Sequence, residues 1–190
     1  KELPDASLLN IPFSRDSIFL KSLPTNFITP ALMDFEMFKY LGITSIQKKN
    51  DFNNLFVPFL CVAADIVNKE SVVFRKGHLN AAVRASMTFP FYINPIRIND
   101  KLLFDGGLYD NFPAQELYNA FNVDYLIGSN VSFNAAPPTE DDLISQITNM
   151  LVFPTDFELP CENGVLIQPQ NNVGTFEFNR AKEAIDIGYQ

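Results

Sequence analysis

Residues 102–113 read LLFDGGLYDNFP, and this stretch decides how the rest of the chain is interpreted. An apolar run ends in Asp105, two glycines follow at Gly106 and Gly107, and a proline that can begin a helix follows at Pro113. The pattern predicts a strand that ends in a sharp turn and carries a carboxylate at its tip, because glycine lets the backbone bend and lets another backbone or a substrate come close. Taken alone, the same letters also fit an ordinary Asp-Gly turn in which Asp105 bonds its own backbone.

Two segments upstream give the turn its context. Residues 84–91 read RASMTFPF, and residues 96–107 read IRINDKLLFDGG. In this order and spacing they resemble the C-terminal half of the patatin-like phospholipase domain, in which a helix ending in R-A-S-x-x-x-P leads to a short hairpin whose second strand ends in D-G-G or D-G-A. The run LYDNFP at 108–113 fits the continuation of that motif, and a weaker likeness extends from about residue 56 to the end of the chain.

Composition limits the classes of function. The 190 residues are 47% hydrophobic and 19% charged, with a net charge of −8 and no basic run. Nucleic-acid binding needs a positive surface and is therefore disfavoured, and any peripheral membrane contact should be apolar, because anionic headgroups repel an acidic protein. Cys61 and Cys161 do not make a disulfide framework or a metal site, and the sequence predicts no cofactor. The sequence contains no signal-peptide pattern and no apolar run that could span a bilayer, so the compartment stays open between the cytoplasm and a bacterial envelope.

Hydrophobic periodicity divides the chain into a variable helical and loop region at 1–55 and an α/β core at 56–190. The helix expected at 30–41 is apolar almost all round and should end at Gly42. It is interpreted first as a core helix, with a lid or interfacial helix over an acyl site as the alternative. Strands are predicted at 56–67, 71–75, 96–98, 102–104, 123–128 and 165–167, and further helices at 79–88, 113–121, 139–152 and 179–188.

Strands that alternate with helices indicate an α/β fold. The near-continuous apolar run at 56–67 is typical of a strand buried on both faces, as in a parallel sheet. The sequence therefore predicts a three-layer α/β/α arrangement with a largely parallel sheet, and the resemblance implies the same architecture. Residues 1–190 are expected to form part of one patatin-like domain.

The resemblance implies a reaction, the hydrolysis of acyl esters by a Ser-Asp dyad. The serine of that family lies in a G-x-S-x-G turn, a glycine-rich loop binds the oxyanion, and the aspartate of D-G-G accepts the serine proton without a histidine. Carried over by motif, Asp105 is the catalytic base, and Gly106 and Gly107 line the site. Hydrogen bonds from backbone N–H groups are expected to favour the charged form of Asp105.

The chain departs from the family at the nucleophile. The sequence contains no G-x-S-x-G and no glycine-rich loop. Ser86 and Ser129 lack the flanking glycines of a nucleophile turn. His78 is interpreted as a surface or helix-capping residue, and Arg84 is expected to form a structural ion pair. The favoured interpretation is the acid-bearing part of a lipid acyl hydrolase, without esterase activity on its own, whose partners are an acyl-ester substrate and the missing N-terminal part of the same domain. The alternative is a catalytically inactive module that binds lipid or a protein.

Overall fold

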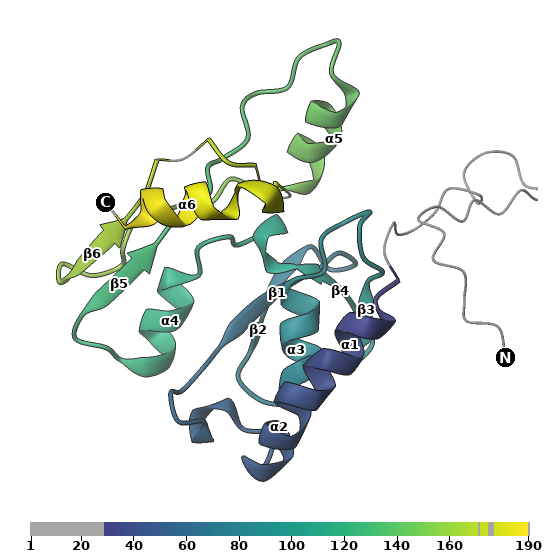
Figure 1. The fold of residues 1–190 in the computed structure, drawn as a ribbon, viewed down its shortest axis with the longest axis vertical. Helices are drawn as coiled ribbons and strands as arrows, with labels where there is room; N and C mark the ends of the chain where they lie inside the picture. The colour runs from purple at the N-terminus through teal and green to yellow at the C-terminus, as the bar shows by residue number, and fades with distance from the viewer. Residues whose placement is uncertain (1–28, 171, 175–176, 190) are drawn as a thin grey trace, which may run out of the picture. The chain divides into compact units, whose positions relative to one another are not determined.

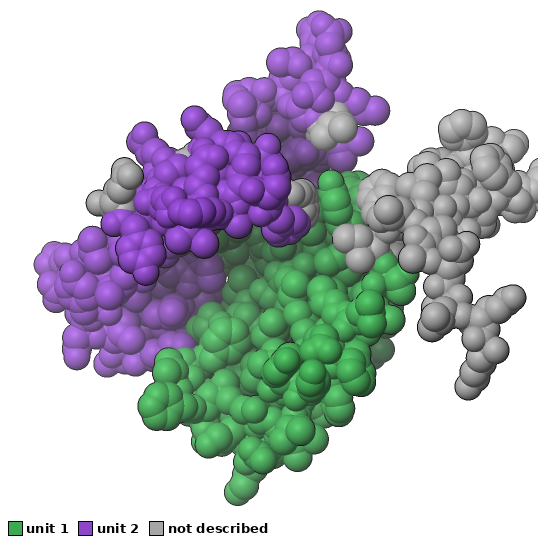
Figure 2. All heavy atoms as spheres, viewed as in Figure 1, with its two compact units in different colours: residues 1–111 green, residues 112–190 purple. Residues whose placement is uncertain are grey.

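The computed structural model describes residues 29–170, 172–174 and 177–189. Two compact units make up the chain, Lys1–Asn111 and Phe112–Gln190 (Figure 2).

The first unit contains a four-stranded sheet in the order β2-β1-β4-β3 (Figure 1). Every neighbouring pair in this sheet is antiparallel. Its strands are β1 (Cys61–Asp65), β2 (Glu70–Phe74), β3 (Ile96–Ile98) and β4 (Lys101–Asp105). The α/β class is thus confirmed, while the largely parallel sheet is wrong, and the three-layer arrangement stays a prediction.

Short connections explain the antiparallel pairing. Residues 66–69 join β1 to β2, and Asn99 and Asp100 alone join β3 to β4. Both residues of the latter turn have positive φ, 48° and 64°, as a two-residue hairpin turn requires. A parallel pair needs a crossover of a dozen or more residues, so neither connection can make one.

One helix covers one face of this sheet. Helix α3 (Leu79–Ser86) contributes Ala85, which packs with Ala63 of β1 and Leu103 of β4, all of them fully buried. A second cluster joins Leu79 and Ala82 of α3 to Phe52, which begins the short 3-10 helix η2 (Phe52–Asn54). The apolar side of α3 and the inner positions of β1 and β4 therefore form the core of the first unit.

The predicted helix at 30–41 continues past its expected end. It runs through α1 (Ala31–Met37), the π-turn η1 (Phe38–Gly42) and α2 (Ile43–Gln47), and lies beside α3 (Figure 1). Gly42 keeps helical angles, φ −63° and ψ −45°, and the ring of Phe38 occupies the space where a Cβ would lie. The prediction that Gly42 ends the helix is therefore wrong, because the glycine makes room for a ring rather than a turn.

The second unit contains one short parallel sheet. Strands β5 (Leu126–Ser129) and β6 (Gly164–Ile167) pair from Leu126 opposite Gly164 to Ser129 opposite Ile167. The helices of this unit are α4 (Ala114–Phe121), α5 (Leu143–Leu151) and α6 (Ala181–Gly188), the last preceded by the 3-10 helix η4 (Phe178–Arg180). This is the one parallel strand pair in the described parts of the chain.

Candidate active site at the D-G-G turn

The backbone of Asp105 is fixed from two sides. Asp105 is the last residue of β4 and pairs with Ala63 of β1, as the prediction of a carboxylate at a strand end required. Its N–H donates a hydrogen bond of 2.9 Å to the carbonyl oxygen of Thr88, which follows α3. The residue also begins the 3-10 helix η3 (Gly106–Leu108). The carboxylate thus lies at the junction between a paired strand and a 3-10 turn.

The carboxylate of Asp105 is partly buried and has a single donor in the described parts of the chain. Its Oδ1 accepts a hydrogen bond of 2.8 Å from the N–H of Gly107. Burial raises the pKa of Asp105 above its usual value, and the Gly107 N–H offsets part of that rise. The expected backbone donor is therefore present and favours the charged form, but desolvation outweighs this one hydrogen bond and the net shift of the pKa is upward. A carboxylate with raised proton affinity is a better general base than an exposed one.

The two glycines are needed for space rather than for an unusual φ angle. A Cβ on Gly106 would lie 2.5 Å from the carbonyl oxygen of Val62 and 2.6 Å from its Cγ2, so the turn rests against β1. A Cβ on Gly107 would lie 2.7 Å from Oδ1 of Asn111 and 3.2 Å from Oδ1 of Asp105. Gly106 therefore meets a backbone, whereas Gly107 lies beside the carboxylate itself.

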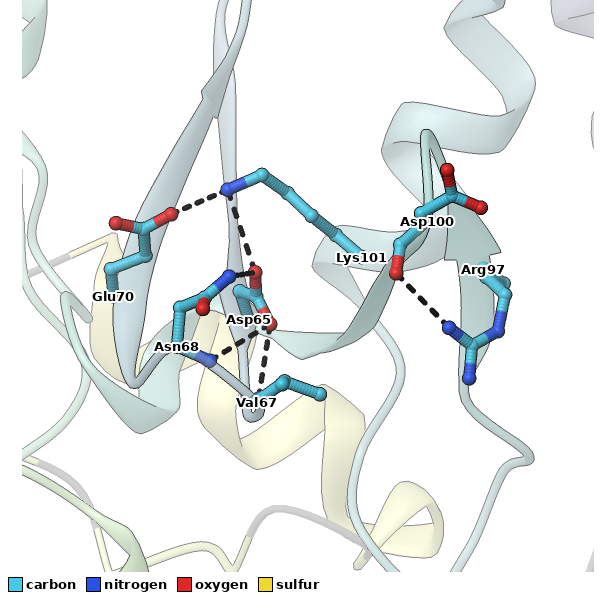
Figure 3. A network of polar contacts seen from close by, with 7 residues as sticks. All are labelled: Asp65, Val67, Asn68, Glu70, Arg97, Asp100 and Lys101. Atoms are coloured by element: carbon cyan, nitrogen blue, oxygen red, sulfur yellow. Dashed lines mark hydrogen bonds and ion pairs between the residues drawn. The ribbon is translucent and has the colours of Figure 1, made fainter.

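A second carboxylate, Asp65, ends the neighbouring strand β1 and is completely buried. It accepts hydrogen bonds from the N–H groups of Val67 (3.0 Å) and Asn68 (3.3 Å) and from the Asn68 side chain (2.8 Å), as Figure 3 shows. Lys101 of β4 approaches it at 3.4 Å and also binds Glu70. Burial alone would raise the pKa of Asp65, but these donors outweigh it and hold the pKa below its usual value. Asp65 is therefore a structural carboxylate.

Sequence reasoning missed this role of Asp65, although a signal was present. An aspartate followed by Asn68 three residues on, at the start of a turn, is the pattern in which an aspartate side chain caps its own backbone. Among the described residues, no group of three or more His, Cys, Asp or Glu side chains could hold a metal ion.

Arg84 makes the structural ion pair expected for it. Its side chain is 5% exposed, and its Nε lies 2.7 Å from Oδ1 of Asp34 in α1. The same guanidinium donates to the side chain of Thr88 and, over 2.8 Å, to the carbonyl oxygen of Asn94. Sequence reasoning named neither Thr88 nor Asn94, because both contacts depend on how separate segments meet.

The other candidate nucleophiles lie in different surroundings. Ser86 ends α3 partly buried, Ser129 is exposed at the end of β5, and His78 is exposed just before α3, as expected of a surface residue. Burial raises the pKa of the Cys61 thiol to about 12, so this cysteine is not activated. Within the described ranges, no helix is long and apolar enough to cross a membrane.

Helix α3 thus carries the R-A-S segment, and the neighbouring strand β4 ends at the D-G-G turn. The sequence profile of the patatin-like phospholipase family matches residues 16–118, more than half of the chain. The chain belongs to the patatin-like phospholipase family. The matched residues include the Arg84 helix and the whole D-G-G turn.

Individual relatives match over shorter stretches. The chain is 35% identical over 85 residues to an uncharacterized NTE family protein of Mycobacterium tuberculosis, covering 45% of this chain and 23% of that relative. It is 31% identical over 93 residues to the lysophospholipase NTE1 of Candida albicans, covering 49% of this chain and 6% of the relative. A patatin-like phospholipase domain-containing protein of Caenorhabditis elegans is 30% identical over 105 residues, 54% of this chain and 8% of the relative. The chain thus spans less than a quarter of the length of these relatives.

Proposed function

We propose that this chain is the acid-bearing part of a lipid acyl hydrolase in which Asp105 acts as the general base of a Ser-Asp dyad. The serine would come from polypeptide outside these 190 residues, because no G-x-S-x-G occurs in them. Family membership and the similarity to a protein named lysophospholipase support a lipid ester as the substrate. On this proposal, residues 1–190 contribute to one patatin-like domain, with 1–55 as a variable region and 56–190 as the α/β core.

The observation that carries the proposal is the environment of the Asp105 carboxylate. Oδ1 is held by Gly107, and Oδ2 accepts no hydrogen bond from the described parts of the chain. Oδ2 is thus available to take the proton of a serine hydroxyl while the serine oxygen attacks the ester carbonyl. The alcohol leaves with a proton, and water then hydrolyses the acyl-serine to release the fatty acid and restore the serine. Burial strengthens the base in both steps, because it raises the proton affinity of Asp105.

The test uses a polypeptide that contains this chain together with a G-x-S-x-G segment. Asp105→Asn keeps the shape of the side chain but cannot accept a proton, so ester hydrolysis should fall by about 10²- to 10⁴-fold with the fold intact. Asp100→Asn is the matched control, because Asp100 is exposed in the β3–β4 turn at a φ of 64°, an angle that asparagine tolerates. Unchanged hydrolysis by the Asp105→Asn protein would end the assignment.

The 190-residue chain alone provides a second test. We expect it to release no nitrophenol from a short-chain nitrophenyl ester above a buffer blank, because its sequence contains no G-x-S-x-G turn that would activate a serine. Turnover that disappears when Ser86 or Ser129 is changed to alanine would contradict the proposal.

A second candidate function is supported by the surface of the first helical segment. Six large apolar side chains of α1, η1 and α2 are each at least 55% exposed, and together we call them the α1–α2 stripe: Leu32, Phe35, Phe38, Tyr40, Ile43 and Ile46. No residue of α1 is buried, which argues against the core-helix interpretation and supports an interfacial one. On this alternative the chain is an inactive module that binds lipid through the stripe.

The two candidates differ in what the stripe does. Changing Phe35 and Phe38 together to Asp should abolish co-sedimentation with phosphatidylcholine vesicles without lowering the melting temperature. Changing Glu36 and Lys39 to Ala is the control, since this exposed ion pair lies on the same helix. If hydrolysis in the complete protein depends on the stripe only for long-chain substrates, the stripe serves the enzyme. Vesicle binding without any Asp105-dependent hydrolysis would favour the inactive module.

A further inference from the structure

The side chain of Arg84 connects three separate segments. It lies in α3, 4% exposed, and binds Asp34 of α1 through Nε at 2.7 Å. One terminal nitrogen donates to the carbonyl oxygen of Asn94 at 2.8 Å, and the other donates to Oγ1 of Thr88. A guanidinium presents its donors in a fixed planar fork, so one side chain serves a carboxylate, a carbonyl and a hydroxyl at once.

Thr88 passes this connection on to the D-G-G turn. It is completely buried, and its hydroxyl donates to the carbonyl oxygen of Arg84 at 2.7 Å, which closes a ring of hydrogen bonds with the guanidinium. The Thr88 N–H donates a hydrogen bond of 3.1 Å to the carbonyl oxygen of Ala85, and the Thr88 carbonyl oxygen accepts one of 2.9 Å from the N–H of Asp105. Two successive hydrogen bonds therefore lead from the Arg84 guanidinium through Thr88 to the backbone of Asp105.

We infer that Arg84 is a positioning residue for Asp105, which acts by fixing the Thr88 carbonyl against the end of β4. The inference rests on the proposed role of Asp105 and adds to it the group that holds this base in place. Arg84 makes no direct contact with the Asp105 carboxylate in the described parts of the chain, so its effect is geometric. Loosening Thr88 would let water reach the carboxylate and would weaken the burial that raises its pKa.

Local measurements on the 190-residue chain distinguish a positioning role of Arg84 from a merely structural one. Thr88→Val removes the hydroxyl and keeps the shape, and Thr88→Ser keeps the hydroxyl. Amide hydrogen exchange followed by NMR should be at least about tenfold faster at Asp105 and Gly107 in the valine variant, while the amide of Val73 in β2 changes much less. The serine variant should restore the exchange rates, and the carboxyl titration of Asp105 should move toward its ordinary range only in the valine variant.

Asp34→Asn tests the outer end of the same connection. It removes the carboxylate charge that faces Arg84 but leaves the bonds to Thr88 and Asn94, so it should lower the melting temperature without changing the titration of Asp105. Arg84→Lys should show the same local opening as Thr88→Val, and where that variant does not fold, the Thr88 pair still decides the matter.

Two results would overturn the inference. One is an equal increase of exchange at Asp105 and Val73 in Thr88→Val, which would mean that Thr88 and Arg84 only stabilise the unit as a whole. The other is an unchanged Asp105 titration in that variant. Both measurements are independent of hydrolysis, so an Asp105→Asn enzyme with normal turnover would end the proposed function and leave the positioning result standing.

Discussion

Two carboxylates at the ends of neighbouring strands have opposite electrostatic surroundings. Asp65 ends β1 completely buried, yet donors from the following turn and from Lys101 hold its pKa below the usual value. Asp105 ends β4 only partly buried, yet with one donor from the described residues its pKa is raised. The number of donors, rather than the depth of burial, decides the sign of the shift. A fully hydrogen-bonded carboxylate stabilises the fold, whereas a poorly hydrogen-bonded one retains the capacity to take a proton.

Of the changes around these two carboxylates, the largest loss of stability is expected at Gly106, which follows Asp105. Gly106→Ala places a methyl group against the backbone of Val62, which cannot move without disturbing β1, so unfolding should become easier by about 2–3 kcal/mol. Urea denaturation followed by circular dichroism measures the change. Gly107→Ala should be milder, because its methyl group meets the end of the Asn111 side chain rather than a strand backbone. Equal losses in both variants would contradict the close packing of the turn on β1.

An intermediate loss of stability is expected when Asp65 is replaced. Because its folded-state pKa lies below the unfolded value of 3.8, the stability it contributes is present above that pH and is lost as the pH falls through the folded pKa. Asp65→Asn should therefore destabilise the protein at neutral pH, by less than Gly106→Ala, and should flatten the acid side of the stability curve. Urea midpoints measured from acid to neutral pH test this. Asp124→Asn, at an exposed carboxylate, is the control and should leave the curve unchanged.

The smallest effect, with the opposite sign, is expected at Asp105. Its folded-state pKa lies above 3.8, so the protein loses stability as the pH rises from that value through the folded pKa. Asp105→Asn should remove this loss and should leave stability at neutral pH unchanged or slightly higher, with any decrease below about 0.5 kcal/mol. The same urea series measures it. A variant as destabilised as Asp65→Asn would mean that Asp105 is a second structural carboxylate.

Local signals in the sequence were sufficient for some elements. The hairpin of β3 and β4 was predicted because a short polar turn separates two apolar runs, and Asp105 was placed at a strand end because D-G-G is itself a local signal. The direction of the strands was not predictable in this way. The apolar run at 56–67, which contains β1, is compatible with a parallel and with an antiparallel sheet. Only the pairing of β1 with β2 and β4 decides between them.

The position of Asp105 in the fold was predictable from the sequence, but its burial and the direction of its pKa shift were not. The pKa of Asp105 depends on burial by segments that are distant in the sequence, and the contacts of Arg84 join positions 34, 88 and 94. The π-turn at Gly42 was missed for a similar reason, since a glycine that accommodates the ring of Phe38 cannot be distinguished from a glycine that ends a helix. The catalytic roles of Asp105, Gly106 and Gly107 stay predictions until the variants are measured.

The ion pair between Lys101 and Asp65 has a consequence for strand register. Successive side chains of a strand point to opposite faces of the sheet, so a slip of β4 by one residue would turn every one of its side chains over. Lys101 and Asp105 are the first and last residues of β4 and share one face, because their positions differ by four, a multiple of the two-residue period of a strand. The bond from Lys101 to Asp65 fixes β4 against β1 at its far end and so determines on which face the carboxylate of Asp105 emerges.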